Sequence, residues 1–321
     1  MKRLDASVTF KWFYTAKYLP TVKAGWKPST LYKNESLFNS AILPVFGDVP
    51  LQDIDKAMIC DHLAKLAETK SKCHIMHVRQ YIKAVLEEAV EQDLLAKNAA
   101  RKIKLPRCSR QKATRFLEVQ EIPHLLAQMK EQHALMVEVA IYGGLRANEL
   151  FALRINDLQP GRLYIDEGVW EGQFDDPKTP SSKAFVSIPK SLYKRLVGYV
   201  AKLKNQDGDA LLFPGRNGKV WRANNFLNRV LKPAAERAEL DGVTIQSLRR
   251  TTATHLSRRA TVSDTKNQMR HSTSSTTFDF YAQSIAGSQT AAVEAFASEV
   301  PNVLNISEHN VNSESLQVVE K

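Results

Sequence analysis

The chain has 321 residues, of which 43% are hydrophobic and 25% are charged, and its mean hydropathy is −0.32. These fractions are typical of globular proteins and exclude a fibrous or wholly disordered chain. At roughly 100 to 200 residues per domain, the length predicts about two domains.

The charge is basic and unevenly distributed. Lys and Arg number 45 against 34 Asp and Glu, which gives a formal net charge of +11. Residues 1–112 hold 20 basic and 11 acidic residues, a balance of +9, whereas residues 296–321 have a balance of −3. A basic front third favours a polyanionic partner, and nucleic acid is the first candidate.

The sequence has no apolar run of the roughly 18 to 20 residues that cross a bilayer, and no apolar signal-peptide core near its start. We therefore expect a cytoplasmic protein with no membrane partner. The three cysteines, Cys60, Cys73 and Cys108, form no pair with the spacing of metal ligands. Neither a disulfide framework nor a structural zinc is expected.

Apolar residues recur at steps of three and four in residues 53–69 and 74–95. This period predicts two amphipathic helices, each with one buried face. No strand-like alternation interrupts them. We expect residues 1–105 to form a small helical bundle.

Residues 29–47 predict a further helix of the same bundle. Ser29 is a candidate N-cap, because its hydroxyl can accept a hydrogen bond from a free backbone N–H of the first turn. Pro44 and Gly47 are stop signals, so the helix is expected to end there.

Residues 101–112 contain six basic residues, one proline and no acidic residue. This composition is typical of an exposed linker, and we place the linker between the two domains at residues 106–115. A basic linker can lie along a phosphate backbone. Lys102, Lys104 and Arg107 are the predicted contacts to such a backbone, although a merely solubilising tether is the alternative.

A larger domain is expected over residues 116–300, with a flexible polar tail over residues 301–321. Its first long apolar run ends at Gly143 and Gly144, which stop a helix. The predicted fold class is therefore mainly α with a small β-sheet: an N-terminal helical bundle followed by a mixed α+β domain.

The sheet is predicted from two strand-like stretches, residues 162–172 and 184–189. They flank residues 173–183, which are rich in turn formers, so a hairpin is expected. Helices return at residue 190 and continue to about residue 299.

Several residues of the second domain suit phosphate chemistry. Singly, each has a bland explanation, because an arginine usually lies on a solvated helix face and a lone histidine or tyrosine usually packs in a core. Their order along the chain and their sequence context indicate a common function, which no single residue does. They are Arg146, Lys178, Arg249, His271 and Tyr281.

In order and context these segments resemble the tyrosine recombinase family, the phage-type integrases. Gly-Leu-Arg-x-x-Glu-Leu, which contains Arg146 and Glu149, resembles the family's first arginine box. Leu248-Arg249, followed by Thr-x-Ala-Thr, resembles the second arginine box. His271, followed by Tyr281, resembles the box that ends in the nucleophile.

The resemblance extends to the rest of the chain. Lys178, in Lys-Thr-Pro-Ser-Ser-Lys, looks like the family's hairpin lysine, and residues 1–105 resemble its helical core-binding domain. Two positions depart from the family's usual residues. Gln246 occupies a position that is usually histidine, and Arg270 one that is usually glycine.

The resemblance implies a site-specific DNA recombinase. Tyr281 would attack the scissile phosphate and form a 3'-phosphotyrosyl bond, which conserves the energy for rejoining. Arg146 and Arg249 would bind the non-bridging oxygens, because a planar guanidinium fork matches phosphate geometry. Glu149 would orient a guanidinium or another basic group.

The remaining residues have auxiliary roles in this interpretation. Lys178 is the candidate general acid for the leaving 5'-oxygen, and Lys183 is its rival. His271 can donate a hydrogen bond to the phosphate. Gln246 can donate through its amide but cannot exchange protons near neutral pH.

No metal and no cofactor is implied. The rival chemistry, that of nucleases and integrases with three catalytic carboxylates, needs those carboxylates to hold two divalent ions. Asp175 and Asp176 have no convincing third partner in the sequence.

The expected partner is double-stranded DNA, on which the family works as a tetramer, with accessory DNA-bending proteins as a further option. The small apolar face in residues 288–300 is a candidate for docking on a neighbouring subunit. A prophage or other mobile element is the expected setting. Two alternatives remain open: a catalytically impaired DNA-binding protein of the same fold, and a helical transcription regulator.

Overall fold

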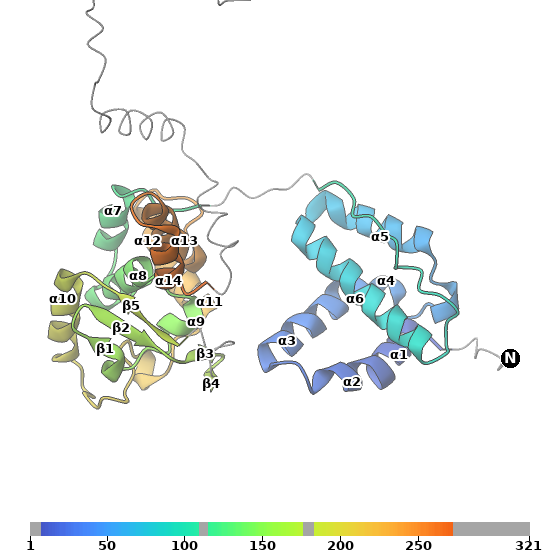
Figure 1. Cartoon of the computed structure of the whole chain (residues 1–321), viewed down its shortest axis with the longest axis horizontal. Coiled ribbons are helices and arrows are strands. Elements are labelled where there is room, and N and C mark those ends of the chain that lie inside the picture. Colours follow the sequence, from blue (N-terminus) through green and yellow to red (C-terminus); the bar gives the residue numbers. More distant parts are fainter. Residues whose placement is uncertain (1–7, 109–114, 176–182, 272–321) are drawn as a thin grey trace, which may run out of the picture. The chain divides into compact units, whose positions relative to one another are not determined.

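The computed structural model describes residues 8–108, 115–175 and 183–271. Contacts divide the chain into two compact units, Met1–Thr114 and Arg115–Lys321, each with its own hydrophobic core (Figure 1). In the described part of the chain, no helix combines the length and the apolar character that crossing a bilayer requires.

The described part of the first unit is helical, as the periodicity predicts. Its 20-residue helix α6 buries one stripe of residues, which includes Ile75, Val78, Ile82 and Leu86. Burying such a stripe against neighbouring helices is the main source of stability in a bundle of this kind. The helices are α1 (Phe10–Phe13), α2 (Leu19–Lys23), α3 (Pro28–Leu37), α4 (Leu43–Phe46), α5 (Lys56–Thr69) and α6 (Lys72–Glu91).

Three helices in the described part of the chain pass through a π turn just before a proline. The π turns Tyr14–Tyr18, Phe38–Ile42 and Leu227–Leu231 each end two residues before Pro20, Pro44 and Pro233, respectively. A proline inside a helix lacks the N–H donor and its ring crowds the carbonyl four residues earlier. The wider π turn relieves that crowding, so the helix continues through the proline.

Two expectations for residues 29–47 are therefore wrong. Pro44 does not stop the helix, which runs on through α4 to Phe46 and ends at Gly47. Ser29 is not the N-cap: α3 begins at Pro28, with Lys27 as the flanking residue. Proline fits the first helical position because its fixed φ suits the helix and its missing N–H would have no partner there.

The basic segment after α6 packs on the core of the first unit as far as Cys108, and most of the linker predicted at residues 106–115 lies outside the described residues. Ile103 is only 4% exposed, and its carbonyl accepts a hydrogen bond from Arg79 Nη1 at 2.9 Å. The side chains on either side of it, Lys102 and Lys104, are exposed. Buried and exposed side chains alternate here, so the apolar residues anchor the segment and its cations face solvent.

The second unit is built around α8, whose residues Leu135–Ile141 are all buried. The Thr252 hydroxyl of α13 donates to the Ile141 carbonyl and ties α13 to α8. The helices are α7 (Glu121–Ala127), α8 (Glu131–Gly143), α9 (Ala147–Leu150), α10 (Lys190–Val200), α11 (Ala223–Phe226), α12 (Lys232–Arg237), α13 (Ile245–Ser257) and α14 (Val262–Met269).

The strands form two small antiparallel sheets (Figure 1). One has the order β1-β2-β5, with Leu163 opposite Val186. The other is the β3-β4 hairpin. The strands are β1 (Leu158–Gln159), β2 (Arg162–Ile165), β3 (Gly168–Trp170), β4 (Gln173–Asp175) and β5 (Ala184–Ser187).

The single sheet expected from residues 162–172 and 184–189 is thus only partly correct. The first of these stretches is divided, because Asp166 and Glu167 separate β2 from β3. β3 pairs with β4, which lies in the stretch expected to be a turn. Two adjacent acidic residues interrupt the strand pattern, and the short segment after them forms its own hairpin.

Candidate active site

Two helices of the second unit end in the left-handed conformation, side by side. α8 ends at Gly144, with φ of 60°, and α14 ends at Arg270, with φ of 49°. A Cβ on Gly144 would lie 2.8 Å from Met269 Sδ, closer than real Cβ contacts, so any side chain there would require the Met269 side chain to shift. Glycine at position 144 therefore satisfies both the backbone conformation and the contact with α14.

The end of α14 is a Schellman motif. The Arg270 N–H donates to the Asn267 carbonyl at 3.1 Å, and the His271 N–H donates to the Lys266 carbonyl at 3.1 Å. The central residue of this motif adopts positive φ and is usually glycine. Arg270 occupies that position although left-handed backbone costs a side-chain-bearing residue roughly 1–2 kcal/mol.

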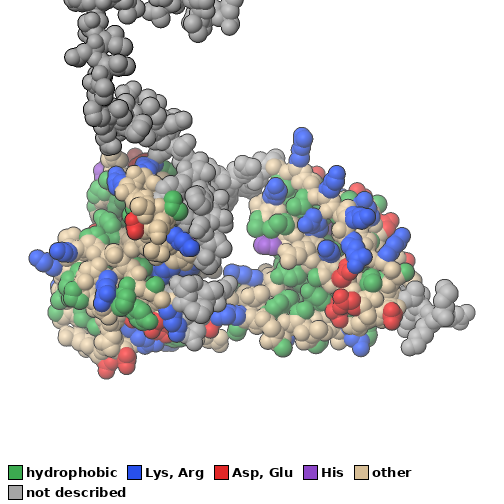
Figure 2. All heavy atoms as spheres, viewed as in Figure 1, with side chains coloured by type: hydrophobic (Ala, Val, Ile, Leu, Met, Phe, Trp, Pro, Cys, Tyr) green, Lys and Arg blue, Asp and Glu red, His purple; other side chains and the backbone are tan. Residues whose placement is uncertain are grey.

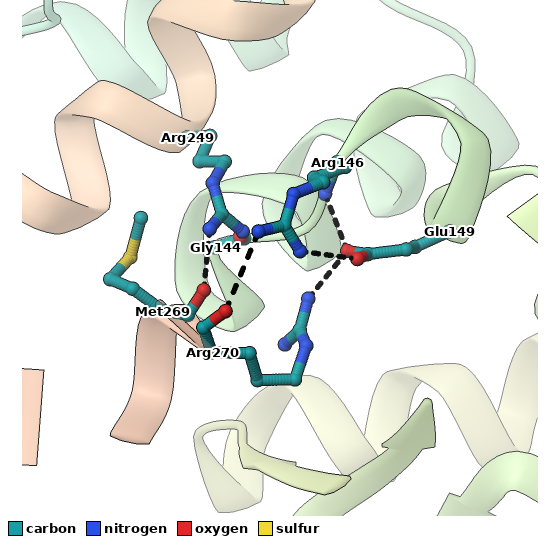
Figure 3. A network of polar contacts seen from close by, with 6 residues as sticks. All are labelled: Gly144, Arg146, Glu149, Arg249, Met269 and Arg270. Carbon is teal, nitrogen blue, oxygen red and sulfur yellow. Dashed lines mark hydrogen bonds and ion pairs between the residues drawn. The ribbon is translucent and has the colours of Figure 1, made fainter. Parts of the chain in front are cut away.

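Arg249, on α13, is held by the ends of both helices (Figure 3). Its Nη1 donates to the Gly144 carbonyl and its Nη2 to the Met269 carbonyl. Helix C-termini carry a partial negative charge, which stabilises a cation. Burial lowers the pKa of Arg249 and the Arg146 charge lowers it further, yet a guanidinium remains charged at neutral pH.

Arg146 is the N-cap of α9 and Glu149 is its third residue. The Arg146 N–H donates to Glu149 Oε2 at 2.7 Å, and its Nη1 donates to Glu149 Oε1 at 2.8 Å. The Glu149 side chain is 7% exposed, whereas that of Arg146 is 41% exposed. The carboxylate therefore fixes a guanidinium whose other edge is open to solvent.

Arg270 reaches the same carboxylate from the end of α14 (Figure 3). Its Nη2 donates to Glu149 Oε2 at 2.5 Å, and its side chain is only 1% exposed. Its carbonyl accepts a longer hydrogen bond, 3.4 Å, from Arg146 Nη2. The Arg270 Nε and Nη1 atoms have no hydrogen-bond partner among the described residues.

The cluster of Arg146, Glu149, Arg249 and Arg270 has a net formal charge of +2. Burial raises the pKa of the Glu149 carboxyl, but the Arg270 charge and then Arg146 lower it by more, so it lies below its ordinary value. Glu149 is therefore ionised at neutral pH. A cluster with two excess positive charges and fixed donors is suited to an anion with several oxygens, such as a phosphate.

His271 directly follows Arg270 and lies within the field of the cluster. Burial and the charges of Arg249, Arg146 and Arg270 lower its pKa to about 4. The imidazole is therefore neutral at pH 7, with one ring nitrogen as a donor and the other as an acceptor.

The structure thus brings together Arg146, Glu149, Arg249 and His271, which are up to 125 residues apart in sequence. Gln246 lies exposed in the first turn of α13, and no hydrogen bond joins it to the cluster among the described residues. Lys183 is exposed, next to β5. Lys178 and Tyr281 lie outside the described residues, as do residues 288–300.

Arg270 was identified from the sequence only as a departure from glycine, and its contact with Glu149 was not predicted. The available signal was an arginine where the family usually has glycine, the residue that favours the left-handed end of a helix. The acceptors of Arg249 are main-chain carbonyls, for which the sequence holds no signal.

Two family models match the chain. The model of the phage integrase family matches residues 115–286, and that of the phage integrase N-terminal SAM-like domain matches residues 9–67. A protein of Mycobacterium tuberculosis strain H37Rv, assigned as the prophage phiRv2 integrase, is 24% identical over 260 residues. The match covers 78% of this chain and 68% of that relative.

Solved structures of integrases share the fold. The Tn1549 transposon integrase, in complex with a circular intermediate DNA, has a TM-score of 0.77 and 19% identity, with 90% of this chain and 100% of that chain covered. A lambda integrase tetramer bound to a Holliday junction has a TM-score of 0.69 and 17% identity, with 86% and 78% covered. The fold resemblance and the two family matches agree, and the chain belongs to the phage integrase family of tyrosine recombinases.

Proposed function

We propose that this chain cuts and rejoins DNA at specific sites through a 3'-phosphotyrosyl intermediate on Tyr281. The observation that carries the proposal is the cluster of two arginines on one buried carboxylate, with Arg249 beside them on two main-chain carbonyls; it has a net charge of +2, and the Arg146 side chain is 41% exposed. The family membership of the chain and the DNA-bound state of the similar integrases support it.

Arg146 and Arg249 are proposed to bind the non-bridging oxygens of the scissile phosphate. Each uses two N–H groups to hold itself in place and keeps its other N–H donors for a ligand. Donors that are fixed before the reaction stabilise charge on the pentavalent phosphorus without reorganising.

The proposed step forms a bond between the phenolic oxygen of Tyr281 and phosphorus as the bond from phosphorus to the 5'-oxygen breaks. The 5'-oxygen takes a proton from Lys178 and leaves as a hydroxyl. The phenolic proton passes to solvent or to the unprotonated ring nitrogen of His271. No water attacks the phosphate, so the reverse step can rejoin the strand.

Gln246 is proposed to contact the DNA as a neutral donor. It precedes Arg249 by one helical turn and so lies on a neighbouring part of the same α13 face. Its exposure in the free protein is compatible with a contact that forms only on DNA.

The first unit and its basic segment are proposed to follow the phosphate backbone. Figure 2 shows Lys and Arg side chains spread over the visible face of this unit, and residues 1–112 carry a balance of +9. Lys102, Lys104 and Arg107 are exposed on an anchored segment. A tetramer on two DNA duplexes, a mobile-element setting and accessory DNA-bending proteins are further parts of this proposal.

The nucleophile is tested with a nicked suicide substrate, which traps the covalent protein–DNA adduct. Tyr281→Phe should abolish the adduct and leave DNA affinity unchanged, because only the attacking oxygen is removed. Tyr193→Phe, on α10 and outside the cluster, is the matched control and should form adduct normally. DNA binding by the wild type without any adduct would identify the chain as an impaired DNA-binding protein instead.

The general acid is tested with a bridging 5'-phosphorothiolate substrate, whose sulfur leaving group departs without a proton. Lys178→Ala should cleave the normal substrate slowly and the sulfur substrate at nearly the wild-type rate. Lys183→Ala is the control for a charge on the same segment. If the sulfur substrate restored the cleavage rate of Lys183→Ala and not that of Lys178→Ala, Lys183 would be the general acid.

The basic segment is tested by the salt dependence of DNA binding. Replacing Lys102, Lys104 and Arg107 with alanine should weaken binding to all sequences and flatten the slope by up to about one unit per lost contact. Arg101→Ala is the control, since Arg101 already pairs with Glu87 at 2.7 Å. An unchanged slope with a sequence-selective loss of affinity would mean that these residues read bases.

A further inference from the structure

Arginine is an energetically unfavourable residue at position 270. It adopts positive φ, where glycine is favoured, and its guanidinium is 1% exposed. Two of its nitrogens, Nε and Nη1, have no partner among the described residues. Its side chain makes one hydrogen bond there, from Nη2 to Glu149 Oε2.

That single bond is made to the carboxylate that also orients Arg146. Glu149 Oε1 accepts from Arg146 Nη1, and Glu149 Oε2 accepts from both the Arg146 N–H and Arg270 Nη2. The Arg270 carbonyl accepts from Arg146 Nη2 as well. Arg270 thus contacts the orienting system of Arg146 through its side chain and through its backbone.

The charges explain what this arrangement can do. With Arg146 alone, Glu149 would neutralise the guanidinium that it orients, and a phosphate would meet a pair without net charge. A second guanidinium on the same carboxylate balances the negative charge from the buried side. Arg146 can then be oriented by Glu149 and still present a positive charge on its exposed edge.

We propose that Arg270 is a positioning residue of the active site, which neutralises Glu149 from within the protein so that Arg146 is fixed in place and keeps its positive charge for the phosphate. This inference rests on the proposed function for the role of Arg146. It assigns to Arg270 an effect on the cleavage rate, with no contact between Arg270 and the DNA.

Three substitutions separate charge from backbone and volume. Arg270→Gly removes the charge and relieves the left-handed backbone. Arg270→Met removes the charge and keeps a long side chain. Arg270→Lys keeps a charge, which is sufficient because Arg270 uses only one nitrogen to bind Glu149.

The rate of adduct formation at saturating suicide substrate is the main measurement, with DNA affinity and thermal unfolding measured in parallel. Arg270→Gly and Arg270→Met should lower the rate about tenfold, a loss of about 1.4 kcal/mol, and change the Kd for DNA by less than about threefold. Arg270→Lys should keep most of the rate. A wild-type rate in Arg270→Gly would overturn the proposal, as would an equal loss in all three variants.

The dependence on Glu149 is tested by combining substitutions. In Glu149→Gln, Arg270 faces a neutral amide, so adding Arg270→Gly should lower the rate no further. Additive losses would show that Arg270 acts independently of Glu149 and would contradict the proposal.

A binding measurement separates this inference from the proposed function. Inorganic phosphate, titrated into the wild type, should shift the NMR signals of the His271 ring, and Arg270→Met should weaken that binding about threefold to tenfold, whereas Arg270→Lys should not. Phosphate binding that depends on Arg270 without any adduct in the wild type would refute the proposed function and support the inference. Equal phosphate affinity in wild type and Arg270→Met would refute the inference.

Discussion

Residues 145–150 and 153–158 of the second unit share the pattern Leu-Arg-x-Asn-acid-Leu. Their local structures agree as well. In each, the arginine N–H donates to the carboxylate three residues later at 2.7 Å, Arg146 to Glu149 and Arg154 to Asp157. Both acids are buried.

The two carboxyls nevertheless have opposite electrostatics. The Arg146 side chain turns to its own acid, Glu149, and Arg270 joins it, so the pKa of Glu149 is lowered. The Arg154 side chain turns away to Glu167.

Without a guanidinium partner, Asp157 has its pKa raised to about 6, mainly by burial and also by the nearby charges of Asp166 and Glu167. The local sequence sets the cap in both segments. Whether a guanidinium from elsewhere in the fold contacts the acid decides whether its pKa is lowered, as for Glu149, or raised, as for Asp157.

The largest expected effect is that of Glu149→Ala on stability. Arg146 and Arg270 would lose their common carboxylate, and Arg270 would remain buried without an acceptor among the described residues. The free energy of unfolding, measured with urea at pH 7, should fall by about 3–5 kcal/mol. Asp157→Ala should cost clearly less, and an equal loss in the two variants would refute the distinction between the two acids.

Asp157→Asn is expected to stabilise the protein at neutral pH. The amide oxygen can still accept the Arg154 N–H, and the cost of ionising a buried carboxyl is removed. Since the pKa of Asp157 is raised from 3.8 to about 6, the native state binds the proton more tightly, and wild-type stability falls as pH rises between these values.

The gain in unfolding free energy from Asp157→Asn should therefore be about 1–3 kcal/mol at pH 7. It should disappear below about pH 4, where the carboxyl is protonated in both states. Urea denaturation at a series of pH values measures it. A gain that does not change with pH would show that ionisation of Asp157 is not its cause.

The third expectation concerns His271, whose pKa is lowered to about 4 by burial and then by Arg249, Arg146 and Arg270. Its ring signals in NMR should stay constant between about pH 5.5 and 8 in the free protein. Arg146→Met should raise the pKa of His271 by up to about one unit. Arg154→Met, in the second segment, is the control, and a similar rise there would contradict the assignment to the cluster.

The smallest expected effect is that of Glu167→Gln on Asp157. Removing this negative charge should lower the pKa of Asp157 and release the Arg154 side chain from its pair. The stabilisation produced by Asp157→Asn should then shrink by about 0.5–1 kcal/mol, as a double-mutant cycle measures. Full additivity of the two substitutions would mean that Glu167 has no influence on Asp157.

Much of the fold could be predicted from the sequence, wherever a short stretch of residues determines the local structure. The apolar period located α6, and the glycine pair located the end of α8. The failures also have a local origin, since proline at position 44 looks like a stop unless the preceding turn is known to widen. Ile103 was overlooked among basic residues, although one buried side chain is enough to anchor its segment.

Less of the candidate active site could be predicted from the sequence. Arg146, Glu149, Arg249 and His271 stand in recognisable segments, and they lie together in the structure. The role of Arg270 depends on Glu149, 121 residues away in sequence, and on a helix end that only the folded chain positions. Pairings of this kind follow from packing, which no window along the sequence reports.

In the first unit, the π turns before prolines determine which face of the helix the following side chains occupy. A π turn holds one more residue than an α turn, so it rotates everything after it by about 100° relative to an uninterrupted α-helix. Phe46, fully buried, lies beyond such a turn. Replacing Pro44 with a helix-forming residue would let the turn tighten and rotate Phe46 away from the core, unless one residue were deleted as well. In these helices, replacing the proline and deleting one residue of the π turn should therefore preserve the core only when both changes are made together.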